Sequence, residues 1–306
     1  MDAWLKRAGV AARIAADHGE LWFPAALAWV AFLGWLPFVL AVARAPDEGD
    51  LTVFGAALVT SGDWPANAIR LGLGLLALAL VANTLIALGE AGLLSLLDGR
   101  PEPSGSALLA AARRLWVVQL LAALPAAAAL IALLTAAVLA AVGELQSPDI
   151  GGSAWMRVAG RVAPFALVLL VTVVAGEAFL AAAARRMTRD RATRFRDAAV
   201  GALRDLAQRP FARIGLGLTS LVLEVAYLLF CLLLLKVLWA PIGEALVEGR
   251  ATTSGAPLLL VGFVAIWLCL VLVGGALHTF VAAWWSLELD DGRREESPVR
   301  EETAAT

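Results

Sequence analysis

Six long apolar stretches, separated by short polar segments, dominate the hydrophobic pattern of this chain. Each is at least as long as the roughly 20 residues that a helix needs to cross a hydrocarbon core of about 30 Å. Backbone groups have no water to bond in lipid, so each stretch is predicted to be a transmembrane helix. The pattern therefore predicts an all-α integral membrane protein with six spans, near residues 21–43, 67–97, 115–142, 160–184, 211–240 and 257–287.

Composition supports this interpretation. Hydrophobic residues make up 61% of the 306 residues and charged residues only 16%, whereas soluble domains have about 45–50% and about 25%. The net charge of −2 is too small to indicate a nucleic-acid partner. We expect the partners to be membrane lipids, some of them anionic, and another membrane protein.

The distribution of Lys and Arg predicts the orientation. Eighteen of these residues fall on the side that holds both chain ends, and five fall on the other side. Basic residues are enriched in cytoplasmic loops, so both termini are predicted to be cytoplasmic. The strong bias to Arg over Lys and the many alanines are typical of a GC-rich bacterial genome, and the predicted location is the bacterial cytoplasmic membrane.

Amphipathic stretches precede three of the spans. In 195–207 the apolar positions recur with helical spacing and the charged residues take mostly the other face, as in a helix lying at a membrane interface. Residues 3–17 and 106–116 occupy the same place before the first and third spans, with weaker periodicity.

A threefold repeat follows from this order. The triplet Gly-Glu-Ala at 89–91 recurs at 176–178, and both of these copies lie near the end of an even-numbered span. We predict three parallel repeats of an interfacial helix and a helical hairpin, related by an axis along the membrane normal. The copies cover about 3–98, 105–186 and 195–289, which form one membrane domain (1–289), and the polar tail 290–306 is predicted to be disordered.

This layout, with its Gly-Glu-Ala triplets followed by arginines, resembles a group of uncharacterised bacterial six-span membrane proteins. It is most similar to the membrane domain attached to some glycerophosphodiester phosphodiesterases. From Asp290 onward the sequence is only "DDGRREESPVREETAAT", without the soluble phosphodiesterase domain. The resemblance therefore implies no catalytic residue for this chain.

Polar residues inside the spans are the candidates for chemistry, because a charge in lipid is costly and usually faces protein or water. Such residues can form a proton or cation path or bind a ligand head group; the alternative is that each only bonds a neighbouring helix. The strongest candidate is Glu224, with Tyr227 one turn away. The set is Glu90, Glu177, Glu224, Tyr227 and His278.

The arginine-rich segment after the fourth span is the candidate for contact with anionic lipid, which attracts basic residues at the membrane surface. The alternative is that these arginines only fix the topology. The residues are Arg185, Arg186, Arg189, Arg191, Arg194 and Arg196.

No catalytic motif, metal-binding spacing or cofactor motif is found, so no enzyme activity, metal or cofactor is expected. The leading hypothesis is a non-enzymatic module that organises lipid or a membrane protein partner. The alternative is a transporter or channel with a polar path through Glu224, Glu90 and Glu177. A lipid-modifying enzyme is the third and weakest interpretation.

Overall fold

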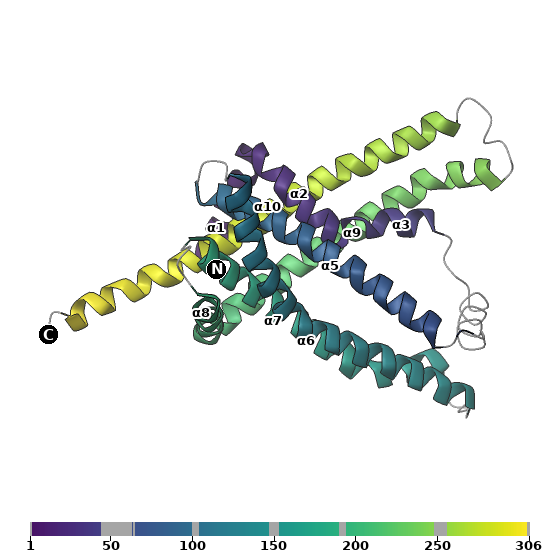
Figure 1. Ribbon diagram of the computed structural model, residues 1–306, viewed down its shortest axis with the longest axis horizontal. Helices are drawn as coiled ribbons and strands as arrows, with labels where there is room; N and C mark the ends of the chain where they lie inside the picture. Colours follow the sequence, from purple (N-terminus) through teal and green to yellow (C-terminus); the bar gives the residue numbers. More distant parts are fainter. Residues whose placement is uncertain are drawn as a thin grey trace. The chain divides into compact units, whose positions relative to one another are not determined.

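The computed structural model describes residues 2–43, 63, 65–99, 104–146, 153–189, 194–247 and 256–304, and every regular element in these ranges is a helix (Figure 1). The elements are α1 (Asp2–Asp17), a 3₁₀ turn η1 (Gly19–Leu21), α2 (Trp22–Trp29), a π-helical turn η2 (Val30–Gly34), α3 (Leu36–Val42), α5 (Ala66–Leu97), α6 (Gly105–Gln146), α7 (Ala154–Arg189), α8 (Phe195–Gln208), α9 (Pro210–Val247) and α10 (Ala256–Ala304).

Five of these helices (α5, α6, α7, α9 and α10) are long and apolar enough to cross a membrane. The first predicted span is instead a broken helix, in which the segments Gly19–Gly34 and Leu36–Val42 are bent by 47°. Pro37 lacks a backbone N–H, and the π-helical turn before it interrupts the regular bonding pattern; both are common causes of kinks. The all-helical, multi-pass membrane architecture is confirmed, with five spans or six if the bent pair crosses as one.

The helices pack as two compact units. Unit 1 comprises residues 1–112 and 223–288, and unit 2 comprises 113–222 and 289–306. The boundaries fall inside α6, α9 and α10.

The core of unit 1 forms around α2. One buried cluster joins Leu21 and Ala25 to Leu93 of α5 and Ala282 of α10. A second joins Ala26 and Trp29 to Val271 of α10. A third cluster lies along α9 and α10 and includes Ala41, Cys231, Leu235, Ile242, Phe263 and Leu270.

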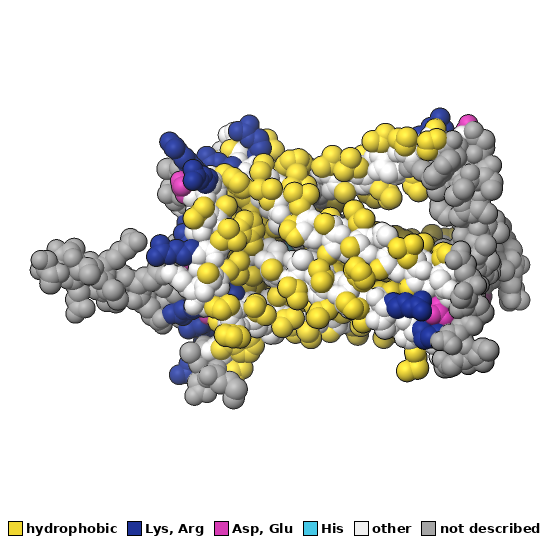
Figure 2. Space-filling view, turned by 90° about the horizontal axis from the view of Figure 1, so that it is seen from below, with side chains coloured by type: hydrophobic (Ala, Val, Ile, Leu, Met, Phe, Trp, Pro, Cys, Tyr) yellow, Lys and Arg dark blue, Asp and Glu magenta, His cyan; other side chains and the backbone are white. Residues whose placement is uncertain are grey.

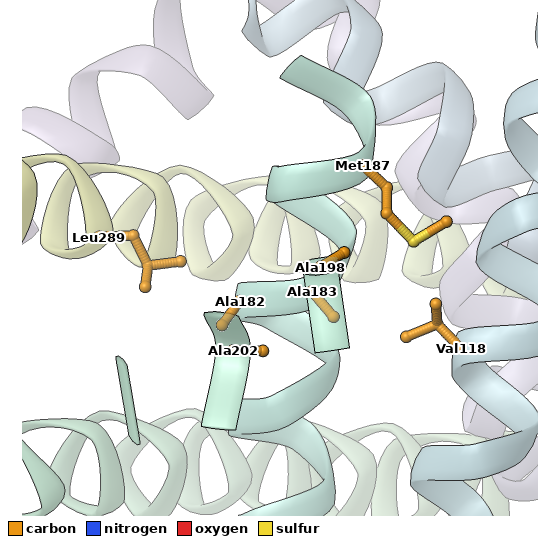
Figure 3. Close-up of a cluster of buried hydrophobic side chains, with 7 residues drawn as sticks. All are labelled: Val118, Ala182, Ala183, Met187, Ala198, Ala202 and Leu289. Atoms are coloured by element: carbon orange, nitrogen blue, oxygen red, sulfur yellow. The ribbon is translucent and has the colours of Figure 1, made fainter. Parts of the chain in front are cut away.

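The core of unit 2 is built mostly from small side chains (Figure 3). Alanines of α7 and α8 face each other, which lets the two backbones approach closely, and Met187, Val118 of α6 and Leu289 of α10 fill the space around them. The buried alanines are Ala182, Ala183, Ala198 and Ala202.

Two of the three predicted interfacial helices are separate elements. α1 covers 2–17 and α8 covers 195–208, close to the predicted bounds. The segment 106–116 is instead the beginning of the continuous helix α6, so the prediction of a separate helix there is wrong. Residues after 116 contain no Gly or Pro until Pro125, so no residue ends the helix, whereas His18-Gly19 follows α1 and Arg209-Pro210 follows α8.

The last helix extends into the tail 290–306, whose predicted disorder stays a prediction. α10 continues past Asp290 to Ala304. Glu and Arg, which are frequent in this segment, have good helix propensity, whereas Gly292 and Pro298 disfavour a helix there. A helix that is already formed also needs no new nucleation step to extend.

Hydrophobic side chains cover the middle of the helices on the face drawn in Figure 2, and the Lys and Arg side chains lie near the helix ends. Large apolar residues of the spans are widely exposed, for example Leu78 (61%), Leu139 (67%) and Val222 (64%). Such exposure fits contact with lipid rather than water.

Candidate functional site

The helix α2 is the surface on which α5 and α10 dock, and glycines make both contacts close. A Cβ atom at Gly89 of α5 would lie 2.6 Å from the Pro24 carbonyl oxygen and 2.7 Å from the Ala28 nitrogen. A Cβ atom at Gly275 of α10 would lie 2.8 Å from the Ala26 Cβ. Only glycine allows these backbones to approach so closely.

These contacts bring three of the predicted polar residues together. Glu90 follows Gly89 directly on α5, and His278 lies one turn after Gly274 on α10. The His278 Nε2 atom lies 2.5 Å from the Glu90 Oε1 atom. On the other side of the ring, the His278 Nδ1 atom lies 3.6 Å from the Glu224 Oε1 atom of α9.

The cluster is largely shielded. The side chains of His278, Glu90 and Glu224 are 20%, 19% and 13% exposed. At 1.5 Å per residue, Glu90 lies about 10 Å before the end of α5 and Glu224 about 21 Å after the start of α9. The cluster therefore lies well inside the apolar segments of three candidate spans.

The geometry suits an imidazole that gains and loses a proton. A protonated imidazole has a donor on each nitrogen, and each nitrogen here faces a carboxylate. The Nδ1 contact is longer than a hydrogen bond, and within the described residues Nδ1 has no hydrogen-bond partner. Nε2 thus makes the short contact, with Glu90, and Nδ1 makes a longer ion-pair contact, with Glu224.

Tyr227, which the sequence places beside Glu224, has a packing role. Its hydroxyl donates a hydrogen bond of 2.7 Å to the Leu270 carbonyl oxygen of α10. Its ring lies 5.5 Å from that of Trp29. Tyr227 therefore fixes α9 against α10 next to the cluster.

Glu177 lies on α7 in unit 2 and is half-buried. The residue before it, Gly176, repeats the packing of Gly89: a Cβ atom there would lie 2.8 Å from the Ala122 carbonyl oxygen of α6. The Gly-Glu-Ala triplets at 89–91 and 176–178 thus each place a glycine against the preceding apolar segment of the chain. At the third triplet, 243–245, a Cβ atom on Gly243 would instead lie 3.4 Å from Trp239 of the same helix.

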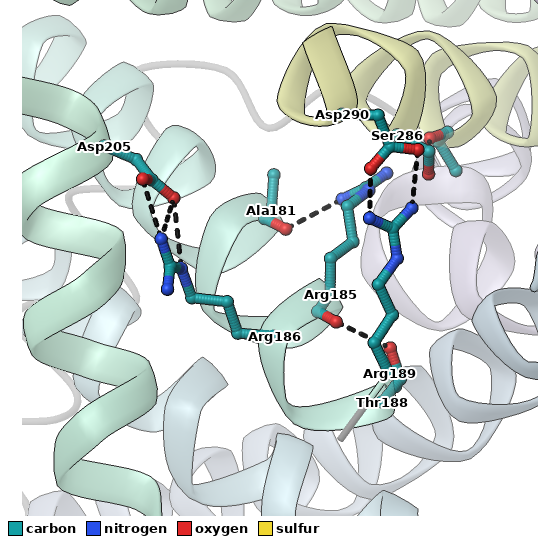
Figure 4. A network of polar contacts seen from close by, with 9 residues as sticks. Ala181, Arg185, Arg186, Thr188, Arg189, Asp205, Ser286 and Asp290 are labelled. Carbon is teal, nitrogen blue, oxygen red and sulfur yellow. Dashed lines mark hydrogen bonds and ion pairs between the residues drawn. The ribbon is translucent and has the colours of Figure 1, made fainter. Parts of the chain in front are cut away.

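Three of the six predicted lipid-binding arginines make contacts within unit 2 (Figure 4). Arg185 is buried and donates to the Ala181 carbonyl oxygen at 2.9 Å. Arg186 binds both carboxylate oxygens of Asp205 on α8, at 2.7 and 2.8 Å from its Nη2 atom. Arg189 binds the Asp290 carboxylate of α10 through two nitrogens.

The other three arginines differ from these. Arg194 and Arg196, at the start of α8, are exposed. Arg191 lies outside the described residues.

Sequence reasoning missed the role of α2 and its neighbours. Trp29 is 3% exposed, and a Cβ atom at Gly34 or Gly274 would lie within 2.6 Å of its ring. The adjacent pair Gly274-Gly275, one turn before His278, was the available signal, since small residues mark close helix contacts in membranes.

The sequence also gave no indication of an ion-pair cluster in unit 2. Glu144 of α6 is bound by Arg157 of α7 at 2.7 Å and lies 3.3 Å from Arg161. It joins the two helices of this hairpin near the ends opposite to Arg186.

In the described part of the chain, no group of three or more His, Cys, Asp and Glu side chains is arranged to hold a metal ion. Comparisons with protein-family models, with curated proteins and with solved structures find no match to this chain.

Proposed function

We propose that this protein is a proton-coupled transporter in which His278, Glu90 and Glu224 take up and release the proton. The single observation that carries the proposal is the position of the imidazole between two carboxylates inside apolar helices. This is the alternative function from the sequence, with a changed set of residues: His278 takes the place of Glu177.

The cost of burying charge supports a functional role for the cluster. Three titratable side chains inside apolar segments are expensive to keep, and ionisable residues there commonly mark proton or ion pathways. A purely structural tie between α5 and α10 needs only the contact between His278 and Glu90. The second contact, in which Nδ1 lies 3.6 Å from the Glu224 Oε1 atom, gives the imidazole a second carboxylate with which to exchange a proton. A proton relay needs this contact and a structural tie does not.

The membrane arrangement in this proposal has six spans, with the bent pair α2–α3 crossing once and both termini in the bacterial cytoplasm. The three repeats remain part of the proposal. The matching positions of Gly89 and Gly176 support the first two copies, and the continuous helix α6 weakens the similarity of the second copy to the others.

Proton flux in proteoliposomes tests the function. Purified protein is reconstituted with a pH-sensitive dye inside, and a pH gradient is applied with and without a membrane potential. We expect flux in the wild type and a loss of roughly 100-fold in Glu224→Gln and Glu90→Gln, the scale of losing a positioned proton-transfer group. Glu244→Gln is the matched control, since Glu244 is exposed near the other end of α9.

Two outcomes contradict the proposal. One is a wild type with no more flux than empty liposomes under either gradient. The other is flux that Glu224→Gln and Glu90→Gln leave at the level of Glu244→Gln in folded, reconstituted protein.

A further inference from the structure

The two faces of α8 have different surroundings. One face is fixed on α7: Ala198 and Ala202 are buried in the unit 2 core (Figure 3). The Arg186 guanidinium lies over Gly201 and binds Asp205. The orientation of α8 about its own axis is therefore set by α7.

The opposite face of α8 is exposed and mixes apolar and basic side chains. Arg196, Val200, Leu203 and Ala207 follow the spacing i, i+4, i+7 and i+11, so they share this face. Val200 and Leu203 are 57% and 58% exposed.

The charge on this face is positive. Arg196 and Arg204 are exposed, as is Arg194 just before the helix. Of the two acidic residues of α8, Asp205 is bound to Arg186. Asp197 is exposed in the first turn, where a negative charge is favoured by the helix dipole.

The position of α8 in the chain indicates what covers this face. α8 ends at Gln208 and the candidate span α9 begins at Pro210. Phe211, in the first turn of α9, is 90% exposed. A helix joined so closely to a span lies at the membrane surface, where apolar side chains enter the acyl boundary and arginines contact lipid phosphates.

We propose that this α8 face, formed by Arg194, Arg196, Val200, Leu203 and Arg204, is a docking surface for anionic phospholipid in the membrane that holds α9. It keeps Arg194 and Arg196 of the lipid site expected from the sequence and omits Arg185, Arg186 and Arg189, which make contacts within unit 2. This proposal does not depend on the cluster of His278, Glu90 and Glu224.

A probe on Leu203 tests the docking directly. Cys231 and Cys269 are replaced by Ala, Leu203→Cys carries a spin label, and the full chain is placed in nanodiscs of phosphatidylcholine with or without phosphatidylglycerol. We expect the label to be accessible to oxygen and protected from a water-soluble nickel complex when phosphatidylglycerol is present, and this protection to fall as salt rises.

Variants that remove positive charge distinguish binding of anionic lipid by this face from contact with any lipid membrane. In the double variant Arg196→Gln with Arg204→Gln, we expect the preference for phosphatidylglycerol over phosphatidylcholine, measured by native mass spectrometry of bound lipid, to fall roughly 30-fold. Arg70→Gln, an exposed arginine in the first turns of α5, is the matched control and should leave the preference unchanged.

Three results would overturn the proposal. The label could remain accessible to the nickel complex in both lipid mixtures. The preference for phosphatidylglycerol could survive the double variant. Protection that depends on protein concentration and not on phosphatidylglycerol would assign the face to a second copy of the chain instead of lipid.

Discussion

The His278 side chain lies between carboxylates from two other helices, so its charge state is coupled to both. In a low-dielectric region, neutralising one charged side chain of such a group leaves an opposite charge buried without a partner, which is costly. The contact of Nε2 with Glu90 at 2.5 Å and the 3.6 Å separation of Nδ1 from Glu224 make the two sides unequal. Glu90 is expected to hold the ring in place, and Glu224 to exchange the proton with it.

Because these two contacts differ in length, the variants Glu90→Gln and Glu224→Gln are expected to differ in stability. Glu90→Gln should lower the thermal midpoint of the protein in detergent more than Glu224→Gln does, because it replaces a charge-assisted hydrogen bond by a weaker one. Thermal unfolding followed by circular dichroism measures this. Equal midpoints for the two variants would contradict the assigned roles.

Trp29 is the residue that connects the cluster to the rest of unit 1. Its ring is 3% exposed and lies against Gly34, Gly274 and Tyr227. We expect Trp29→Ala to destabilise the protein by about 3 kcal/mol or more, the usual cost of a large buried cavity. Phe23→Ala on the same helix, where Phe23 is 76% exposed, should cost far less in the same denaturation assay.

At the scale of single residues, the sequence identifies candidate side chains but not the side chains that they contact. Glu90, Glu224 and His278 are recognised because ionisable groups are rare in apolar segments. Their meeting is not predictable from spacing, since it depends on Gly89 and Gly275 fitting against particular backbone atoms of α2. Glu177 shows the limit clearly: it shares the local pattern of Glu90 but lies in unit 2.

At the scale of elements, the Gly-Glu-Ala triplets at 89–91 and 176–178 mark sites where two helices approach closely. Gly89→Ala would place a Cβ atom 2.6 Å from the Pro24 carbonyl oxygen of α2. Because backbone cannot move aside cheaply, we expect a loss of about 1–3 kcal/mol in unfolding free energy. The measurement is unfolding of purified protein in detergent by a denaturant series.

The matched control for that substitution is on the same helix. A Cβ atom at Gly72 of α5 meets nothing within 4 Å. Gly72→Ala should be neutral or slightly stabilising, since alanine has the higher helix propensity. If both substitutions have the same effect, the close approach of α5 to α2 is wrong.

The ends of helices were predictable where the sequence contains residues that end a helix. α8 and α1 were predicted closely because Arg209-Pro210 and His18-Gly19 follow them. The start of α6 was not, because residues 106–116 run on into the apolar stretch without a helix-breaking residue. The break in the first span depends on the π-helical turn packed by Trp29 against Gly34, which hydropathy does not report.

At the scale of the whole chain, the proposed topology places both termini on the cytoplasmic side. This requires the bent pair α2–α3 to cross the membrane as one span, in addition to the five long helices. Protease treatment of N-terminally and C-terminally tagged protein should remove both tags in inverted vesicles and neither in right-side-out vesicles. Removal of the two tags in opposite preparations would show that the bent pair does not cross.

The central claim is that His278 is bonded to Glu90 and faces Glu224, and the chain offers a direct measurement of it. Only two histidines are present, so a His18→Gln variant labelled with ¹⁵N-histidine reports His278 alone by NMR in lipid. We expect its imidazole signals to change with pH between neutral and protonated forms, and both Glu90→Gln and Glu224→Gln to shift them while Glu244→Gln does not. Signals that stay the same in Glu90→Gln and Glu224→Gln would contradict the cluster and the transport function built on it.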